Sequence, residues 1–422
     1  MSNLILHGAT AQPQTLAQAT VFDTATGIKQ NVVQMFWSMQ QGFKSDGVTP
    51  NYTNFPVTFA DTLWKRGQLY LQTWGPADWV SKVGWSANDI CSGRYDSYFA
   101  TQAGLIKTWA HPLFIRLMHE FNGSWTYYGP ANPPNKPVGW TPDDHVRVWR
   151  YVVSFFRAQG ATNITWVWCP NALSPAGSTS TTASDKLPAY YPGDDVVDWT
   201  AFDAYNWGAP RSSQWLSFST ICSGSTATAS WIGDTYGTIA RIAPSKPMMI
   251  AEFGCHNVGG DRVAWIKDAL ATTPVKYPLV RAINYYNVDL GDAGATWPLL
   301  TGDGTGAAWA AGIKAGPYAQ QLFPMPPDLQ PILPLQSATW GDPTRGLMIQ
   351  LAQAQQSVAA LQTAHISDAD QHGADLAALA DAWSKLDATR VLLASTQAAF
   401  TIATQTLRDT RQVLDSFRSL LG

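Results

Sequence analysis

Eight short apolar runs recur along the first 290 residues or so, and each is followed by a polar or glycine break and then a longer segment of helical character. Short, continuously apolar strands that alternate with helices indicate a parallel sheet that is covered on both faces. Eight such units predict an α/β fold, a (β/α)8 or TIM barrel, over residues 1–322 and closed by a helix at 307–322. The runs are Leu4–His7, Val32–Trp37, Leu69–Trp74, Leu113–Glu120, Ile164–Cys169, Val197–Ala204, Met248–Glu252 and Ala282–Asn287.

The chain contains only two glutamates, although it has 30 acidic residues. Glu120 ends the apolar run that begins at Leu113, and Glu252 ends the run that begins at Met248. The carboxyl ends of barrel strands form one face, and active sites lie there. Paired carboxylates are what retaining glycosidases use, one as acid/base and the other as nucleophile. The alternative is that both glutamates are buried structural carboxylates.

The low charge of the chain restricts its partners. Charged residues make up 14% of the sequence, and the formal net charge is −3. We expect no nucleic-acid partner, because no basic stripe is present to neutralise phosphates. No apolar run approaches the roughly 18 residues of a transmembrane helix, so we expect no membrane span. The first residues lack the basic and apolar regions of a secretory signal, so we expect no signal peptide.

Aromatic side chains are abundant, with 20 tryptophans that nearly all precede residue 341. A tryptophan-rich core explains this, and so does a groove of aromatic faces that stack on sugar rings. The groove is the stronger interpretation for Trp125 and Trp207, which we place in loops. The four cysteines lack metal-ligand spacing, so we expect no metal site, and the sequence leaves their disulfide state open.

A proline-rich segment separates the barrel region from a tail of different composition. Five prolines lie between Pro324 and Pro334, a density that excludes a helix and predicts an extended linker over residues 323–341. Residues 344–422 contain no proline, and a seven-residue apolar period runs from Leu351 to Leu421. This period predicts a coiled coil over residues 342–422.

A long helix with one apolar stripe needs a partner for that stripe, so we predict a homo-oligomer through residues 342–422, with a trimer favoured. A helical hairpin broken near residues 367–373 is the alternative. Polar residues occupy the middle of the seam, at His365, Asp368, His372 and Asp375. Polar seam residues usually set register and oligomer state, and an axial metal or anion site is the less favoured interpretation.

The segment RLMHEFNGSW, residues 116–125, and the segment IAEFG, residues 250–254, resemble the acid/base and nucleophile motifs of glycoside hydrolase family 26. Segments 92–96, 163–168 and 197–208 are similar to further motifs of this family, in the same order. The family comprises mainly β-mannanases, with β-1,3-xylanases and mixed-linkage β-glucanases among its members. The resemblance covers about residues 1–320 and leaves out the helical tail.

This resemblance implies that Glu120 is the general acid/base and Glu252 the nucleophile of a retaining mechanism that needs no cofactor. Two carboxyls about 5–5.5 Å apart raise one another's proton affinity, which suits an acid that must be protonated near neutral pH. Arg116 shares strand parity with Glu120, so we expect it to point into the barrel and keep a carboxylate ionised. A structural ion pair is an equally weighted interpretation of Arg116, and the two are compatible.

The family also implies substrate-binding residues in this sequence. By resemblance, His119 lines the reactive subsite and Tyr205 orients the nucleophile. Trp125 corresponds to an aromatic platform that follows the acid/base, and Trp207 is a candidate second platform.

Two further positions complete the predicted site. Asn122 either hydrogen-bonds sugar hydroxyls or shapes its turn. The eighth predicted strand carries Tyr286 where the family often has a tryptophan, which leaves the sugar open.

Together these features predict a retaining endo-β-glycosidase that acts on a β-linked polysaccharide, with a mannan as first choice. The linker and the coiled coil suit a protein built into a larger assembly. Our hypothesis is a phage tail component in the virion, in contact with other tail proteins; a cytoplasmic or non-classically exported protein is the alternative. The competing function is a non-catalytic glycan-binding adhesion or structural tail module.

Overall fold

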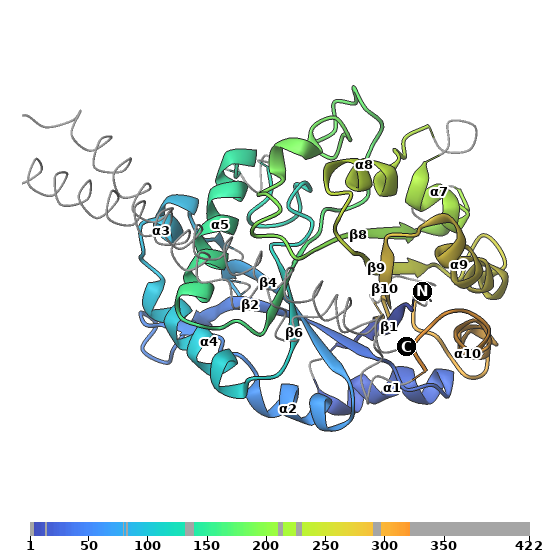
Figure 1. The fold of residues 1–422 in the computed structure, drawn as a ribbon, viewed down its shortest axis with the longest axis horizontal. Helices are drawn as coiled ribbons and strands as arrows, with labels where there is room; N and C mark the ends of the chain where they lie inside the picture. Colours follow the sequence, from blue (N-terminus) through green and yellow to red (C-terminus); the bar gives the residue numbers. More distant parts are fainter. Residues whose placement is uncertain are drawn as a thin grey trace, which may run out of the picture. The chain divides into compact units, whose positions relative to one another are not determined.

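The computed structural model describes residues 4–12, 15–78, 80–81, 83–130, 139–209, 214–224, 230–289 and 297–320. These residues form a closed barrel of parallel strands surrounded by helices (Figure 1). The predicted (β/α)8 barrel is therefore confirmed. The predicted linker at 323–341 and the predicted coiled coil at 342–422 lie outside the described residues, and both stay predictions.

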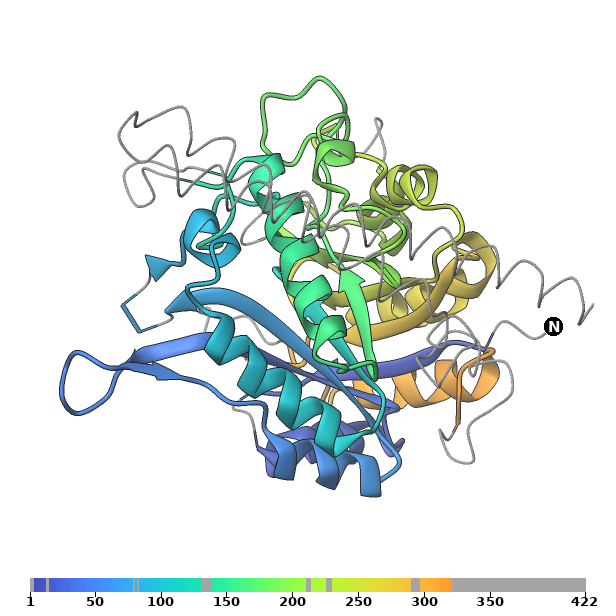
Figure 2. The same ribbon diagram turned by 60° about the vertical axis from the view of Figure 1, so that its left-hand side comes forward.

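All eight predicted barrel strands are present, and each pairs in parallel with its neighbours around the ring. In order around the barrel they are β1 (Leu6–Thr10), β2 (Val32–Phe43), β4 (Leu69–Asp78), β6 (Leu113–Leu117), β7 (Ile164–Trp168), β8 (Trp199–Asn206), β9 (Met248–Cys255) and β10 (Val280–Tyr285). Pairing of β10 with β1 closes the barrel. Two short strands, β3 (Pro50–Tyr52) and β5 (Val83–Gly84), pair antiparallel with β2 and β4. The β2–β3 ribbon projects beyond the barrel (Figure 2).

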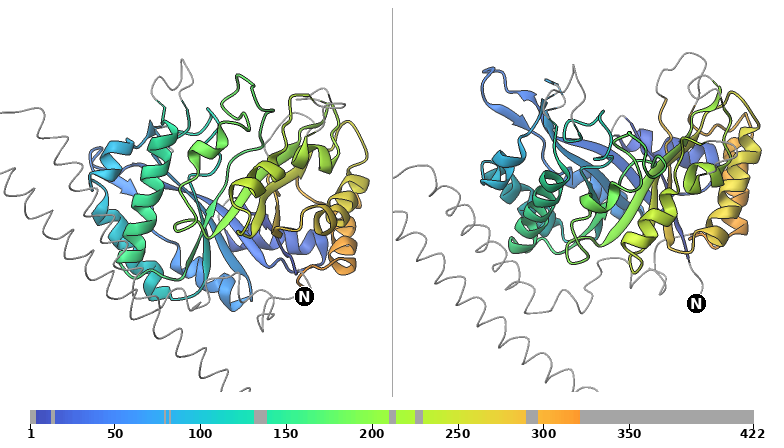
Figure 3. Two further views of the ribbon diagram at one scale, coloured as in Figure 1. Left: turned by 45° about the horizontal axis from the view of Figure 1, so that its top comes forward. Right: turned by 90° about the horizontal axis from the view of Figure 1, so that it is seen from above.

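Helices follow the strands and cover the outside of the barrel (Figure 1 and Figure 3). They are α1 (Leu16–Thr26), α2 (Val57–Lys65), α3 (Ala87–Cys91), α4 (Asp96–Trp109), α5 (Pro142–Ala158), the 3-10 helix η1 (Leu187–Tyr190), α7 (Phe218–Ser223), α8 (Thr235–Ile242), α9 (Arg262–Lys276) and α10 (Thr305–Ala315). The closing helix expected at 307–322 is α10, which ends earlier because Gly316 caps it and Pro317 follows.

Alternate residues of each strand fill two different hydrophobic cores, as the two-residue period of a strand requires. On β4, Leu69 and Leu71 face the barrel interior, whereas Tyr70 belongs to the layer between the strands and the helices. One apolar cluster fills much of the barrel interior. Its members include Val32, Phe114, Val167, Ala201, Met249 and Ala282. Buried charged side chains, among them Arg116, Asp203 and Glu252, lie toward the carboxyl ends of the strands, which is where the candidate site lies.

Strand β6 ends three residues earlier than predicted. Met118 and Glu120 have positive φ angles, 49° and 50°, and residues in this left-handed region cannot continue a pleated strand. Their backbone N–H groups still donate to the carbonyls of Trp74 and Cys169, each over 2.8 Å. The segment is therefore a fixed turn rather than a strand. Positive φ at non-glycine residues is strained and clusters at functional sites.

Other features of the described residues bear on the sequence expectations. All four cysteines are described, and all have free thiols. Within the described ranges, no helix is long and apolar enough to cross a bilayer. In the same ranges, His, Cys, Asp and Glu side chains do not form any group of three or more that is arranged to hold a metal ion.

Candidate active site

A cavity opens where the carboxyl ends of the barrel strands meet, the face that carries the active site in barrel enzymes. Its volume is about 660 Å³, within the usual range of ligand pockets. Seven of the nine residues predicted for the site line this cavity: His119, Glu120, Trp125, Tyr205, Trp207, Glu252 and Tyr286. The two predicted catalytic glutamates, which are 132 residues apart in the sequence, therefore share one wall of one cavity.

The carboxylate of Glu252 accepts hydrogen bonds from three side chains. It lies in β9 and is 4% exposed. The side-chain amide of Gln34 donates to its Oε1 over 3.1 Å, and the guanidinium of Arg116 forms an ion pair with the same oxygen. The hydroxyl of Tyr205 donates to the other oxygen, Oε2. Three donors fix the orientation of this carboxylate and stabilise its negative charge.

Arg116 lies beneath the cavity and not in its wall, since it is fully buried in β6. Its Nη1 lies 2.7 Å and 2.8 Å from the two carboxylate oxygens of Asp203, and its Nε donates to Thr73 over 2.9 Å. Burial lowers the pKa of Arg116, but the carboxylates of Asp203 and Glu252 outweigh it and raise the pKa well above its usual value. The predicted inward orientation is correct. Arg116 is also among the residues predicted to bind substrate; it does not line the cavity, and this role stays a prediction.

Asp203 was missing from the predicted site. A register shift between β8 and β9 follows Phe202 and places Asp203 directly opposite Glu252. Two carboxylates in this position repel each other unless a cation lies between them, and Arg116 is that cation. The signal in the sequence was the spacing of Asp203 and Tyr205, which puts both on the same face of β8.

Glu120 has a different environment from Glu252. It is partly exposed at the cavity wall, and the indole N–H of Trp125 donates to its Oε2 over 2.5 Å. Burial raises the pKa of Glu120 to about 7, and repulsion from Glu252 acts in the same direction. The hydrogen bond from Trp125 and the charge of Arg116 oppose this rise. A carboxyl with a pKa near 7 both gives and takes a proton near neutral pH, as an acid/base requires.

His119 lines the cavity as a neutral side chain. Burial lowers its pKa well below the usual value, and the nearby Arg116 charge lowers it further. Its Nδ1 lies 3.0 Å from the hydroxyl of Tyr128, and its ring meets the ring of Phe36 edge-on at 5.3 Å. Tyr128 and Phe36 were not predicted. Phe36 lies in β2, far from His119 in the sequence, and no local pattern encodes that contact. Tyr128 follows His119 by nine residues, but the fold of the intervening turn decides whether the two side chains meet.

A second cavity of about 700 Å³ continues from the first. Phe36, His119, Trp125 and Tyr286 line both cavities. The glutamates line only the first cavity, so the second extends the groove to one side of them. An open groove of this kind fits a chain-like ligand better than a small molecule.

Asn122 does not line either cavity. It is 1% exposed, and its side-chain amide exchanges two hydrogen bonds with the backbone of Asn171, at 2.8 Å and 3.3 Å. Of the two roles considered for Asn122, the structure therefore favours shaping the turn. A role of Asn122 in substrate binding stays a prediction.

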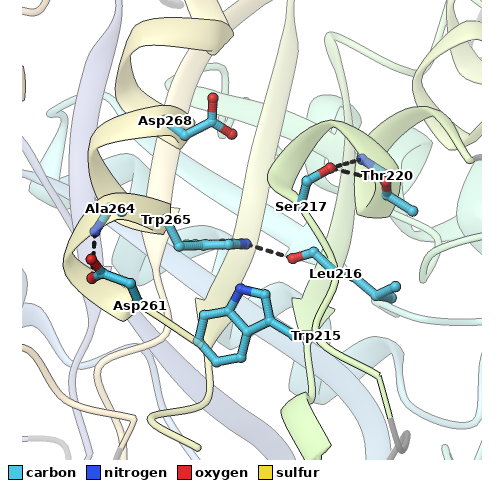
Figure 4. Close-up of a pocket in the computed structure, with 8 residues that line it drawn as sticks. All are labelled: Trp215, Leu216, Ser217, Thr220, Asp261, Ala264, Trp265 and Asp268. Atoms are coloured by element: carbon cyan, nitrogen blue, oxygen red, sulfur yellow. Dashed lines mark hydrogen bonds between the residues drawn. The ribbon is translucent and has the colours of Figure 1, made fainter. Parts of the chain in front are cut away.

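Another pocket, of about 490 Å³, lies between α7 and α9 (Figure 4). Trp215 forms one wall, with Asp261 and Asp268 on the side of α9. Neither glutamate lines it. The glutamate pair therefore lies in the cavity at the strand ends.

The sequence matches the model of glycosyl hydrolase family 26 over residues 91–245. This range includes Glu120 and Asp203 but stops before Glu252. Endoglucanase H of Acetivibrio thermocellus is 31% identical over 297 residues, which cover 68% of this chain and 29% of that protein. A mannan endo-1,4-β-mannosidase of Bifidobacterium adolescentis is 31% identical over 108 residues, 25% of this chain and 10% of that protein. The chain thus spans less than a third of the length of either relative.

Among solved structures, an enzyme of family 26 has a similar fold. A family 26 β-mannanase from Bacteroides ovatus superposes with a TM-score of 0.52 and 14% identity, covering 75% of this chain and 90% of that one. At this identity the likeness concerns the fold, which agrees with the closed parallel barrel described above. From the matched motifs, the barrel and the relatives together, we conclude that the barrel domain of this chain belongs to glycosyl hydrolase family 26.

Proposed function

We propose that this protein is a retaining endo-β-glycosidase that hydrolyses a β-linked polysaccharide by a double displacement. One observation carries the proposal: two glutamates share a cavity, yet their environments differ. Glu252 is buried among three hydrogen-bond donors, whereas the pKa of Glu120 is raised to about 7. Titratable pairs whose environments separate their proton affinities are the mark of an assigned acid and base.

In the first step, a carboxylate oxygen of Glu252 attacks the anomeric carbon of the sugar, and the bond from that carbon to the glycosidic oxygen breaks. Glu120 gives its proton to this oxygen, so the leaving chain departs as an alcohol. A covalent glycosyl ester on Glu252 remains.

In the second step, water attacks the same carbon and the ester bond to Glu252 breaks. Glu120 takes the proton from this water, which returns both carboxyls to their starting states. Esterified Glu252 carries no charge, so the repulsion that raised the pKa of Glu120 is absent when Glu120 acts as a base.

The groove supports a polymer as substrate, because it extends to one side of the glutamates over a second cavity of about 700 Å³. The names of the two relatives given above, an endoglucanase and a mannan endo-1,4-β-mannosidase, favour a glucan or a β-1,4-mannan, and mannan remains our first choice. Tyr286, directly after the eighth barrel strand, lines both cavities and stands where the family often has a tryptophan, so the choice of sugar is open at this position.

The competing function is glycan binding without turnover, as an adhesion or structural module. The tail bears on this choice, because a trimeric coiled coil over residues 342–422 would raise avidity for a repetitive glycan. We also propose that the glycosidase is part of a phage tail, with other virion proteins as partners. Its test is the presence of this chain in purified virions; a free oligomer in the cytoplasm would contradict it.

Purified protein incubated with β-mannan, β-1,3-xylan, mixed-linkage β-glucan and bacterial envelope glycans tests the activity through new reducing ends. Glu252→Gln removes the nucleophile with little change in shape, and Asp268→Asn is the matched carboxylate-to-amide control in the other pocket. The proposal expects release by the parent and the control but not by Glu252→Gln. Equal release by all three would contradict the two-glutamate mechanism. Binding of one glycan without release by any of them would establish the competing function.

A further inference from the structure

Trp231 is an exposed tryptophan in the catalytic cavity that the mechanism does not use. It is 48% exposed and lines the same cavity as Glu120 and Glu252, but not the second cavity. A single exposed tryptophan is ordinary on a protein surface, but one that lines the cavity of the two glutamates is placed to contact the ligand of that cavity.

The backbone that carries Trp231 is held in place. The N–H of Gly233 donates to the carbonyl of Leu173 over 2.7 Å, and the N–H of Leu173 donates to Thr235 over 2.9 Å. A Cβ at Gly233 would lie 2.5 Å from the carbonyl oxygen of Ser174. This glycine therefore allows the two segments to touch, and the indole is presented from a fixed support.

Hydroxyl groups from the loop after β7 line the cavity together with Trp231. Ser174 and Ser180 each place their Oγ 2.9 Å from the hydroxyl of Thr182, and the backbone N–H of Ser174 donates to the carbonyl of Thr182 over 2.9 Å. All three residues line the cavity. A flat aromatic face beside a row of hydroxyls matches a pyranose ring, which presents C–H groups on its faces and hydroxyls at its edge.

We infer that Trp231 and this hydroxyl row form a distal sugar subsite, which binds a pyranose unit of the glycan away from the bond that is cleaved. The inference rests on the proposed function for the identity of the ligand as a glycan. Trp231 is not among the described side chains that hydrogen-bond the two glutamates, which are Trp125, Gln34, Arg116 and Tyr205. We therefore place its subsite away from the cleaved bond, where only the longer ligands reach it. Trp231 is thus a specificity-determining residue for chain length.

Trp231→Ala tests this in two measurements on one series of β-1,4-manno-oligosaccharides and one of mixed-linkage β-gluco-oligosaccharides, from disaccharide to hexasaccharide. The first is binding by calorimetry in a Glu252→Gln background, where no turnover occurs. We expect Trp231→Ala to weaken binding of the longest oligosaccharides about tenfold, which corresponds to about 1.4 kcal/mol, and to leave the shortest that bind unchanged. Trp231→Phe keeps a flat ring and should retain most of the affinity.

The second measurement is hydrolysis of the same series by chains with intact glutamates. Trp231→Ala should lower kcat/KM only for the longer substrates. Trp215→Ala removes a tryptophan side chain from the pocket between α7 and α9. This control should leave the binding and the hydrolysis of both oligosaccharide series unchanged. Thermal unfolding confirms that each variant is folded.

The possible outcomes separate this inference from the proposed function. Length-dependent loss of binding in Trp231→Ala without hydrolysis by the parent would support the subsite and contradict the enzyme. Hydrolysis by the parent that is equally fast in Trp231→Ala at every length would overturn the subsite alone. An equal loss at every length, including the disaccharide, would place Trp231 at the cleaved bond and also overturn the distal assignment. Absence of binding to either series would contradict the subsite as stated.

Discussion

The indole N–H of Trp125 donates a hydrogen bond to Oε2 of Glu120 over 2.5 Å. Trp125 itself is 54% exposed, so one face of its ring remains available to a ligand. The hydrogen bond from Trp125 lowers the pKa of Glu120, and we propose that the exposed ring also serves as a platform in the groove.

The first prediction concerns the alkaline limb of activity. Because Glu120 must be protonated for the first step and its pKa is about 7, kcat/KM should fall about tenfold per pH unit above that value. The bond from Trp125 lowers the pKa of Glu120, so Trp125→Phe should move the limb to higher pH. The measurement is kcat/KM against pH for both proteins. A limb that stays in place or moves to lower pH would contradict the assignment of Glu120.

The second prediction concerns the hydrogen bonds that orient Glu252, the proposed nucleophile. Tyr205→Phe removes the hydroxyl that donates to Oε2 of Glu252. Hydrogen bonds to charged groups contribute about 1.5–3 kcal/mol, so kcat/KM should fall about 10- to 100-fold. Tyr286→Phe removes a hydroxyl from the wall of the same cavity and should affect mainly KM. Equal effects on kcat from both substitutions would show that Tyr205 has no special role.

The third prediction concerns stability. Arg116→Met would leave the carboxylates of Asp203 and Glu252 buried without their cation, and breaking a buried ion pair typically costs about 3–5 kcal/mol. Asp203→Asn added to Arg116→Met removes one of the uncompensated charges and should recover part of this loss. Denaturant unfolding of the parent, both single variants and the double variant gives the coupling. If the loss of unfolding free energy in the double variant equals the sum of the losses in the two single variants, Arg116 and Asp203 do not share a charge network.

How much of this site could be read from the sequence differs from residue to residue. Eight strands were predictable because strands buried on both faces are continuously apolar. The inward orientation of Arg116 was predicted from its even spacing to Glu120 along one strand. β6 ends at Leu117, so Glu120 lies outside the strand and this spacing was not a valid reason for the prediction. The left-handed backbone of Met118 and Glu120 could not be predicted, because neither residue type favours it.

Contacts between distant segments account for what the sequence did not reveal. Gln34 reaches Glu252 across 218 residues of sequence, and no local pattern encodes such a pair. Two roles were open for Asn122 from the sequence, because asparagine in a loop after a catalytic residue serves either role equally well. The structure decides by giving its amide two backbone partners.

The fourth prediction concerns acid stability. His145 is 1% exposed beside Phe121, and burial lowers its pKa to about 3. In the unfolded chain this histidine takes up a proton near pH 6.5. Below that pH the unfolded state binds more protons than the folded state, so the free energy of unfolding should fall as pH falls, by up to about 1.4 kcal/mol per unit. His7, whose pKa burial lowers to about 4, adds to the same trend.

The check is the unfolding free energy of the parent and of His145→Phe between pH 7 and about pH 5, above the folded-state pKa values. The variant lacks one of the titrating groups, so its stability should depend less steeply on pH. Equal slopes for the two proteins would mean that His145 is not buried in its neutral form.

The covalent intermediate on Glu252 is the most direct test of the mechanism. A 2-deoxy-2-fluoro glycosyl fluoride of the sugar that the parent releases slows the second step more than the first, so the ester accumulates and can be weighed by mass spectrometry. We predict one added fluoroglycosyl group per chain, on the peptide that contains Glu252, and no addition to Glu252→Gln. Addition at another residue, or turnover of this reagent with inversion at the anomeric carbon, would contradict the two-glutamate retaining mechanism.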